Sequence, residues 1–388
     1  MGDIVRSNDE KNSDVQVWSD GKQKHEGDSI STGFRSEMEN KTFMNTEFND
    51  VSELKQVWNS WDFEARTAFR DEYGDIVYML YVPVDQALLQ ALVGFWNSAY
   101  SCFTIGDLDL TPTIKEYQDH VNCKKIKENR VYSKTGKNKP FRVKLQKLSD
   151  TLMLWVDRQV GTWNNKEYLK VDGILPLASV YPAGRVQRNL FALLIYGLVL
   201  FPKALGFIHP AVFDLFDRLA KGGNPVPVIL SETFHSLRFC RKHVGGRFLG
   251  CPQLLTMWFY SHFWMDVSFS RPVYDCKFSA LEEFLRKENW PTKRTEEVWL
   301  DVLQNLSASD IVWRVPWSSA RNILYRCGMY SWVPLLGLWG HMAYAPLLVL
   351  RQYGSKQFVP ATDGLREFNI DYQREKGYKG KVYAASSA

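Results

Sequence analysis

Basic residues are concentrated in one short stretch, and this stretch carries the clearest chemical signal in the sequence. Between residues 124 and 147, ten lysines and arginines stand against the single acid Glu128, a local balance of +9 in a chain whose net charge is +5. Clustered cations neutralise phosphates, and the interleaved rings of Tyr132 and Phe141 offer stacking faces. The stretch predicts sequence-independent nucleic-acid binding, with these phosphate contacts: Lys124, Lys125, Lys127, Arg130, Lys134, Lys137, Lys139, Arg142, Lys144 and Lys147. A solvated loop that keeps the protein soluble explains the same pattern, and both readings stay open.

Thiols and imidazoles form a second group of candidates. Cys240, His243, Cys251 and His262 are four residues of the types that bind zinc tetrahedrally. The paired CxxC or HxxxH spacing that marks zinc sites is missing, and Cys251 and His262 border or lie in an apolar helix. We therefore expect no metal site here, but buried cysteines and partly exposed histidines.

Carboxylates are a third group, since three of them can hold Mg²⁺ for phosphoryl chemistry. No spacing rule selects a trio from the candidates, which are Asp75, Asp85, Asp107, Asp109, Asp214 and Asp217. Asp214 and Asp217 are expected on the solvated face of a helix. The phosphate-loop, dinucleotide, HExxH and GxSxG motifs are absent from the sequence. We expect no cofactor and no enzymatic activity, and a remnant transposase or transferase remains the alternative.

The elements that would position these residues are mostly helical. A stripe in "DVSELKQVWNSWDFEARTAF" predicts a helix, "IVYMLYVPV" a short strand and "DQALLQALVGFW" a helix. "CFTIGDLDL" predicts a hairpin that turns at Gly106 and Asp107. The next helix can be capped by Thr111, with Pro112 in first position, or by Thr113 in a capping box with Glu116.

The second half of the chain is richer in apolar segments. "NLFALLIYGLVLF" and "PQLLTMWFYSHFWMDV" predict enclosed helices, and "AVFDLFDRLAKGG" an amphipathic helix that stops at Gly222 and Gly223. "TEEVWLDVLQNL" predicts a helix capped by Thr295, and "DIVWRVPW" a strand. Residues 332–350 contain no charge, but Pro334, Gly337, Gly340 and Pro346 predict a buried, broken helix and not a membrane span.

Composition bounds the fold class. The chain has 388 residues, 45% of them hydrophobic and 14% aromatic, which is enough apolar surface for a large core. Strand patterns are few and short, so we predict a mainly α fold with a few short β-hairpins. We expect a disordered acidic and polar tail over 1–46, one large helical domain over 47–375 and a flexible tail over 376–388. The N-terminal "MGDIVRSNDE" has no apolar signal core, so free cysteine thiols and a nuclear or cytoplasmic location are expected.

Two blocks of the sequence resemble a known family. "LLQALVGFWNSAYSCFTIGDLDLTPTIKEYQDHV" and "WVPLLGLWGHMAYAPLLVLRQYGSKQFVPA" are similar to the plant mobile domain, also called aminotransferase-like. "NLFALLIYGLVLFPKALG" and "PVPVILSETFHSLRFCRKHVGGRFLGCPQLLTMWF" look like a plant branch of that superfamily, a domain of unknown function abundant in transposon-rich genomes. The motif residues, expected to be structural, are Trp96, Phe103, Gly106, Pro112, Trp332, Pro334, Leu350, Arg351, Gln352, Gly354, Gln357 and Pro360.

This resemblance implies a non-enzymatic interaction module of transposable-element origin. Related proteins are linked to nuclear gene silencing and genome maintenance. Transfer of that role to this chain is an analogy between families and rests on no site residue. Protein partners are therefore expected, nucleic acid is the alternative partner, and no membrane partner is expected. "LRQYGSKQFVPA", residues 350–361, is expected to be a packed corner because its cations suit the end of a helix at Gly354.

Overall fold

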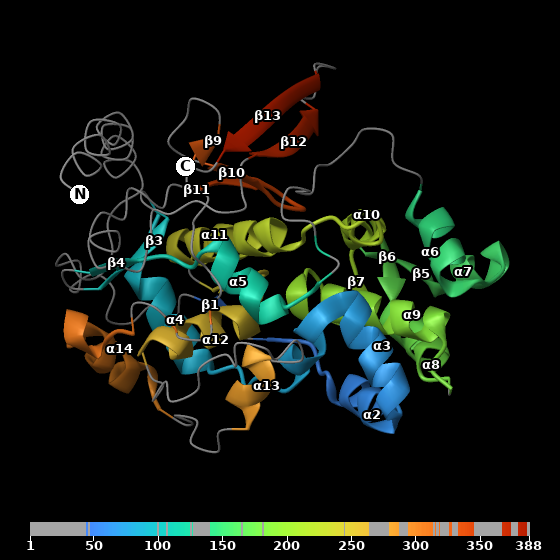
Figure 1. Cartoon of the computed structure of the whole chain (residues 1–388), viewed down its shortest axis with the longest axis horizontal. Helices are drawn as coiled ribbons and strands as arrows, with labels where there is room; N and C mark the ends of the chain where they lie inside the picture. Colours follow the sequence, from blue (N-terminus) through green and yellow to red (C-terminus); the bar gives the residue numbers. More distant parts are fainter. Residues whose placement is uncertain are drawn as a thin grey trace.

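The fold is mainly helical, as predicted, with short antiparallel sheets at its edges (Figure 1). The computed structural model describes these residues: 44–45, 47–98, 101–105, 108–124, 126, 140–163, 166–180, 182–243, 245–263, 279–286, 294–312, 315, 318, 326–327, 333–344, 367–373 and 379–385. Statements about the structure below concern these residues.

The helices follow one another through most of the described chain. Their bounds are α2 (Ser52–Ser60), α3 (Phe63–Tyr73), η3 (Gly74–Leu80), α4 (Gln86–Phe95), α5 (Ile114–Val121), α6 (Phe141–Ser149), α7 (Met153–Gln159), α8 (Val171–Ala178), α9 (Arg185–Ile195), η4 (Tyr196–Leu200), α10 (Pro210–Leu219), α11 (Val226–Lys242), α12 (Pro252–Phe263), α13 (Ala280–Leu285), α14 (Glu296–Gln304) and η5 (Ala308–Asp310).

The strands are short and pair in small sheets. Their bounds are β1 (Met44–Asn45), β2 (Trp96–Asn97), β3 (Cys102–Ile105), β4 (Leu108–Leu110), β5 (Val160–Trp163), β6 (Lys166–Lys170), β7 (Phe207–Ile208), β8 (Gly246–Arg247), β9 (Arg326–Cys327), β10 (Val333–Leu336), β11 (His341–Tyr344), β12 (Glu367–Gln373) and β13 (Lys379–Ala385). The orders are β2-β3-β4, β5-β6-β7, β12-β13-β9, β10-β11 and β1-β8, and only the β1-β8 pair is parallel in this set. The predicted hairpin of "CFTIGDLDL" is confirmed as β3-β4.

The core forms around α11, which crosses the middle of the molecule in Figure 1. It packs against α4, α5 and the β10-β11 hairpin. Every residue of α12 is buried, and so is every residue from Leu190 to Phe201 across α9 and η4. The two segments predicted to be enclosed are therefore confirmed as interior over their described residues, while 264–267 of the second lie outside the described residues.

Polar caps at helix starts were the most accurate local signals. Thr113 caps α5 in a capping box with Glu116, so of the two predicted alternatives the second is correct and Pro112 lies before the helix. Thr295 caps α14 as predicted, and Asp85 caps α4 by accepting the N–H of Leu88. A side chain that accepts from the first turn stabilises a helix by about 1 kcal/mol.

The stripe over residues 50–69 is two helices and not one. Asp62 ends the run, because its carboxylate accepts the N–H of Ala65 at 2.8 Å and caps α3 as a separate helix. The strand predicted for "IVYMLYVPV" is also wrong, since residues 74–80 form the 3-10 helix η3. Gly74 allows this turn: its φ is +72°, and a Cβ there would lie 2.3 Å from the carbonyl oxygen of Val121.

Residues 333–344 form the β10-β11 hairpin, which corrects the prediction of a broken helix. The same Pro334, Gly337 and Gly340 that argued against a continuous helix favour a turn, closed by the Gly337 N–H to Gly340 carbonyl bond at 2.8 Å.

The strand predicted for "DIVWRVPW" is not present in its described residues, where Asp310 ends η5 and Val312 donates its N–H to the His262 carbonyl. Within the described ranges, no helix is long and apolar enough to cross a bilayer.

Candidate functional site

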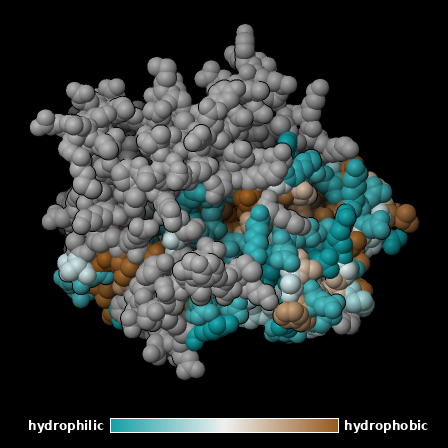
Figure 2. Space-filling view, in the orientation of Figure 1, coloured by the Kyte–Doolittle hydropathy of each residue, from teal (hydrophilic) through white to brown (hydrophobic). Residues whose placement is uncertain are grey.

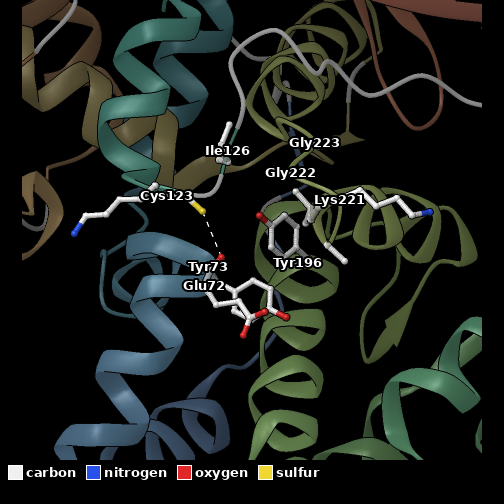
Figure 3. Close-up of a pocket in the computed structure, with 11 residues that line it drawn as sticks. Glu72, Tyr73, Cys123, Ile126, Tyr196, Lys221, Gly222 and Gly223 are labelled. Atoms are coloured by element: carbon white, nitrogen blue, oxygen red, sulfur yellow. Dashed lines mark hydrogen bonds between the residues drawn. The ribbon is translucent and has the colours of Figure 1, made fainter.

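A cleft opens between α3, α6, α9 and α10, and its two lobes have volumes of about 500 and 740 Å³. Both lobes share Glu72 and Tyr73 from the end of α3 and Ala220 and Lys221 from the end of α10, so they adjoin one another. Figure 3 shows the smaller lobe, with Cys123 on one side, Tyr196 on the other and Glu72 and Tyr73 below. Volumes of this size are typical of ligand sites.

Cations dominate the lining of the cleft. Lys124, Lys144, Lys147, Arg185, Arg218 and Lys221 line one or both lobes, against the acids Glu72 and Asp217. Lys124, Lys147 and Arg185 are exposed and form no ion pair with any residue in the described ranges. Hydrophilic residues gather over this side of the molecule in Figure 2. The cleft therefore presents net positive charge in a concave surface, which concentrates anions.

Two of these lysines are held by aspartates of α10. Lys144 Nζ lies 2.8 Å from Asp214 Oδ1, and Lys221 Nζ lies 2.8 Å from Asp217 Oδ2. The prediction that Asp214 lies on a solvated face is wrong, because its exposed fraction is only 6% and it anchors α6 to α10. Asp217 is partly exposed, as expected. The helical pattern around Asp214 could not show that a lysine seventy residues earlier would cover it.

Tyr73 and Asn189 form a hydrogen bond in the wall of the larger lobe. Tyr73 Oη donates to Asn189 Oδ1 at 2.7 Å, and the Tyr73 ring stacks on Phe216 with centroids 5.7 Å apart. Burial raises the pKa of Tyr73 well above its usual value, although the guanidinium groups of Arg185 and Arg188 oppose this rise. The hydroxyl is therefore protonated and acts as the donor.

Three of the ten predicted phosphate contacts lie on the cleft, namely Lys124, Lys144 and Lys147. Arg142 is instead paired with Asp157 and Glu167, and this double pair raises its pKa. Six predicted contacts lie outside the described residues: Lys125, Lys127, Arg130, Lys134, Lys137 and Lys139. Sequence reasoning missed Arg185 on α9, Arg218 on α10 and Lys221 in the turn after α10. None of them belongs to a run of charges, and only the packing of α9 against α10 brings them together.

The candidate metal ligands do not assemble. Among the described residues, no three His, Cys, Asp or Glu side chains are grouped so that they could hold an ion. Cys240 donates its thiol to the Gly246 carbonyl, and burial raises the pKa of both Cys240 and Cys251 to about 12, so both stay protonated. Cys102, Cys123, Cys240 and Cys251 are free thiols, as expected.

The candidate carboxylates have separate structural partners. Asp75 accepts from Arg70 and Asn122, Asp85 accepts from Trp299 Nε1 at 2.9 Å, and Asp109 accepts from the Thr104 hydroxyl. Asp107 lies outside the described residues. Burial raises the pKa of Asp75, while the charge of Arg70 opposes that rise. The five described candidates, Asp75, Asp85, Asp109, Asp214 and Asp217, do not converge on a common point.

A second polar cluster is enclosed in the core. Glu116 Oε1 lies 3.1 Å from His262 Nε2, and Glu116 Oε2 accepts from Thr113 and from Trp258 Nε1 at 3.2 Å. The prediction that His262 is partly exposed is therefore wrong, whereas His243 is exposed. Because neither lobe of the cleft touches this cluster, its role is to join α5 to α12.

The described motif residues fill the interior. Trp96 and Phe103 are fully buried with ring centroids 5.1 Å apart, Pro112 is buried before α5, and Pro334 pairs in register with Ala343. The other motif residues lie outside the described residues: Gly106, Trp332, Leu350, Arg351, Gln352, Gly354, Gln357 and Pro360. The segment 350–361 falls there too, so its expected role as a packed corner stays a prediction.

The fold and the cleft define a mainly helical protein with one cationic concave face in its described part. The chain belongs to a family described as a domain of unknown function, DUF7745, whose model matches residues 54–385. Comparisons with curated proteins and with solved structures gave no match.

Proposed function

We propose that this chain is a non-enzymatic binding module that holds nucleic acid by its phosphates, with little preference for base sequence. One observation carries the proposal: among the described residues, six lysines and arginines line the cleft against the acids Glu72 and Asp217, while Asp214 holds one of the six, Lys144. Phosphate contacts supply most of the affinity in sequence-independent binding, and they come from lysine and arginine side chains.

The aromatic residues of the cleft favour binding through phosphate contacts over binding through base stacking. In the lining of the larger lobe, Tyr73 stacks on Phe216, and Phe213 packs against Phe141 with centroids 5.5 Å apart. These rings are occupied by one another, so they do not offer the open faces on which bases stack. The cleft is therefore suited to a sugar-phosphate backbone.

The origin and location of the protein belong to the same proposal. The resemblance of its sequence blocks to the plant mobile domain supports a transposable-element origin and a nuclear role in gene silencing or genome maintenance. A cationic module that binds nucleic acid of any sequence is compatible with such a role if a partner protein selects the target site. This part rests on analogy between families and not on the cleft.

Binding of fluorescent oligonucleotides tests the proposal. Lys147→Glu and Arg185→Glu should each weaken binding at least tenfold for every base sequence tried, because each variant places an acid in the cleft. Lys55→Glu, on α2 and away from both lobes, is the matched charge reversal and should change affinity little. Equal losses in all three variants, or no binding by the wild-type chain, would sink the proposal.

A second candidate function is contact with a protein partner through the start of α7. Leu152 and Leu154 are 77% and 64% exposed, and apolar atoms show at the α7 end of the molecule in Figure 2. Exposed leucines beside one another are typical of interaction surfaces. Leu152→Ser with Leu154→Ser should abolish a protein contact and leave oligonucleotide binding unchanged. A partner that binds the double variant as well as it binds the wild-type chain would rule this surface out.

A further inference from the structure

The Tyr73–Asn189 hydrogen bond fixes which end of the asparagine amide faces the larger lobe. Tyr73 Oη donates its hydrogen bond to Asn189 Oδ1 at 2.7 Å, so the amide oxygen of Asn189 faces the phenol. The amide nitrogen of Asn189, with its two N–H donors, is then left for other contacts. No partner within the described residues takes these donors, and Asn189 lines the lobe.

Arg185 stands one helical turn before Asn189 on α9. Residues four apart lie on the same face of a helix, and both line the larger lobe. Arg185 is also close enough to Tyr73 to lower the pKa of its hydroxyl. The guanidinium and the amide therefore present N–H donors side by side along α9.

Two further cations approach the same lobe from other helices. Lys147 comes from α6 and Arg218 from α10, so donors arrive from three directions. The acid Asp217 is held by Lys221 at 2.8 Å, which leaves Glu72 as the other carboxylate in the lining of this lobe. A group with several acceptor oxygens and negative charge fits this arrangement, and phosphate has both properties.

We propose that Asn189 and Arg185 bind one phosphate group in the larger lobe, with Lys147 and Arg218 balancing its charge and Tyr73 positioning the amide. The ligand class is a phosphate ester, and under the proposed function, on which this inference rests, it is one backbone phosphate of a nucleic acid. Tyr73 does not touch the phosphate but holds Asn189 in the donating orientation. Without it, the amide rotates freely and turns its oxygen to the ligand part of the time.

Tyr73→Phe tests the positioning role. It should weaken binding of inorganic phosphate and of an oligonucleotide about three- to tenfold, the loss expected for one hydrogen bond. Tyr81→Phe is a matched control, since Tyr81 Oη donates to Asn59 Oδ1 at 2.9 Å outside the cleft. If the two variants bind phosphate equally well, the positioning role is refuted.

Asn189→Asp tests the donor itself. The aspartate keeps the shape of the side chain and still accepts from Tyr73, but it replaces the N–H donors by a charged oxygen. Phosphate affinity should fall more than tenfold, with unchanged thermal unfolding. Gln187→Glu adds the same charge two residues away on α9, at a position that lines neither lobe, and should cost less than threefold.

The outcomes separate this subsite from the proposed function. If both charge-adding variants lose affinity equally, the loss is long-range electrostatics and the subsite is refuted, whereas nucleic-acid binding stands. If inorganic phosphate binds and Asn189→Asp abolishes that binding while no oligonucleotide binds, the subsite stands and the proposed function falls. If wild-type protein binds no phosphate at all, the subsite falls.

Discussion

His262 Nε2 lies 3.1 Å from Glu116 Oε1, within hydrogen-bond distance, although 146 residues separate the two in the chain. The other ring nitrogen, Nδ1, lies 2.7 Å from the carbonyl oxygen of Val312, which can only accept. The imidazole of His262 therefore bridges the Glu116 carboxylate and the backbone at Val312, and both side chains are buried in the core. Burial alone would raise the pKa of Glu116, but the charge of His262 and hydrogen bonds from His262 and Thr113 hold it below its usual value.

Glu116→Gln should destabilise the protein by about 1–3 kcal/mol, because the amide leaves a buried donor of this cluster without its acceptor. The glutamine also places N–H groups against the Thr113 or Trp258 donors. Urea unfolding followed by fluorescence measures the change. Glu53→Gln, at an exposed position in the first turn of α2, should shift the midpoint little. A midpoint for Glu116→Gln within error of the wild-type value would contradict a stabilising role of the Glu116 carboxylate.

Stability should fall as the pH drops below about 6.5, in part because of His120. Burial lowers the pKa of His120 from 6.5 to about 3, with the charges of Glu116 and His262 acting in opposite senses. Between these two values the unfolded chain takes up a proton that the folded chain refuses, so acid favours unfolding by about 1.4 kcal/mol per pH unit.

Urea unfolding between pH 6.5 and 5 checks this dependence. His120→Gln cannot titrate and should flatten the dependence on pH, whatever its effect on stability at pH 7. His243→Gln, at an exposed position after α11, should leave the slope as it is. An unchanged slope in the His120 variant would show that other groups cause the acid sensitivity.

The salt dependence of oligonucleotide binding should report the contacts of the cleft. Each lysine that neutralises a phosphate contributes about one counter-ion, so Lys147→Ala should reduce the slope of log affinity against log salt by about 0.7 to 0.9. Lys55→Ala should leave the slope unchanged, because Lys55 on α2 packs over the ring of Tyr81 and lines neither lobe. Equal slopes for Lys147→Ala and the wild-type chain would remove Lys147 from the interface.

Gly337→Ala should destabilise the β10-β11 hairpin by about 1–3 kcal/mol, the usual cost of overpacking. A Cβ at Gly337 would lie 2.1 Å from Glu232 Oε1, and that carboxylate is fixed because it accepts the backbone N–H of Trp339 at 3.0 Å. Gly340→Ala, in the same turn, would meet only His235 atoms at 3.6 Å or more and is the matched control. Thermal unfolding of the two variants measures the difference. Equal transition temperatures would contradict the steric clash between a Cβ at Gly337 and Glu232.

Local signals in the sequence predicted the parts of the fold that local chemistry determines. Thr113 with Glu116 and Thr295 mark helix starts because a cap needs only its own first turn. The apolar run from Leu190 to Phe201 could be placed inside because no face of it is polar. Residues 76–84 were misread because β-branched and aromatic residues favour strands on average, whereas here η3 is set by Gly74 packing against α5.

The cleft was only partly visible in the sequence. The charge run marked Lys124, Lys144 and Lys147, because ten cations in one stretch form a compositional signal that needs no tertiary structure. Arg185, Asn189 and Arg218 carry no such signal, since each becomes part of a site only when α9, α10 and α3 pack together. The pairing of Lys144 with Asp214 was hidden for the same reason, and it shows that part of the positive stretch serves to hold helices together.

The wide π turn of η4 has a consequence for how this protein tolerates insertions and deletions. The N–H of Phe201 reaches back five residues to the Tyr196 carbonyl at 2.9 Å, so this turn contains one residue more than an α-helical turn. Loss of one residue in η4 would turn it into an ordinary α-helical turn. Arg185 and Asn189 precede η4 on α9, so their positions on the cleft would not change. Such a loss would rotate everything downstream by about 100°, including Ile208, which packs into the space left by the missing side chain of Gly197. The extra residue thus lets one continuous helix place Arg185 and Asn189 on the cleft and Gly197 against Ile208.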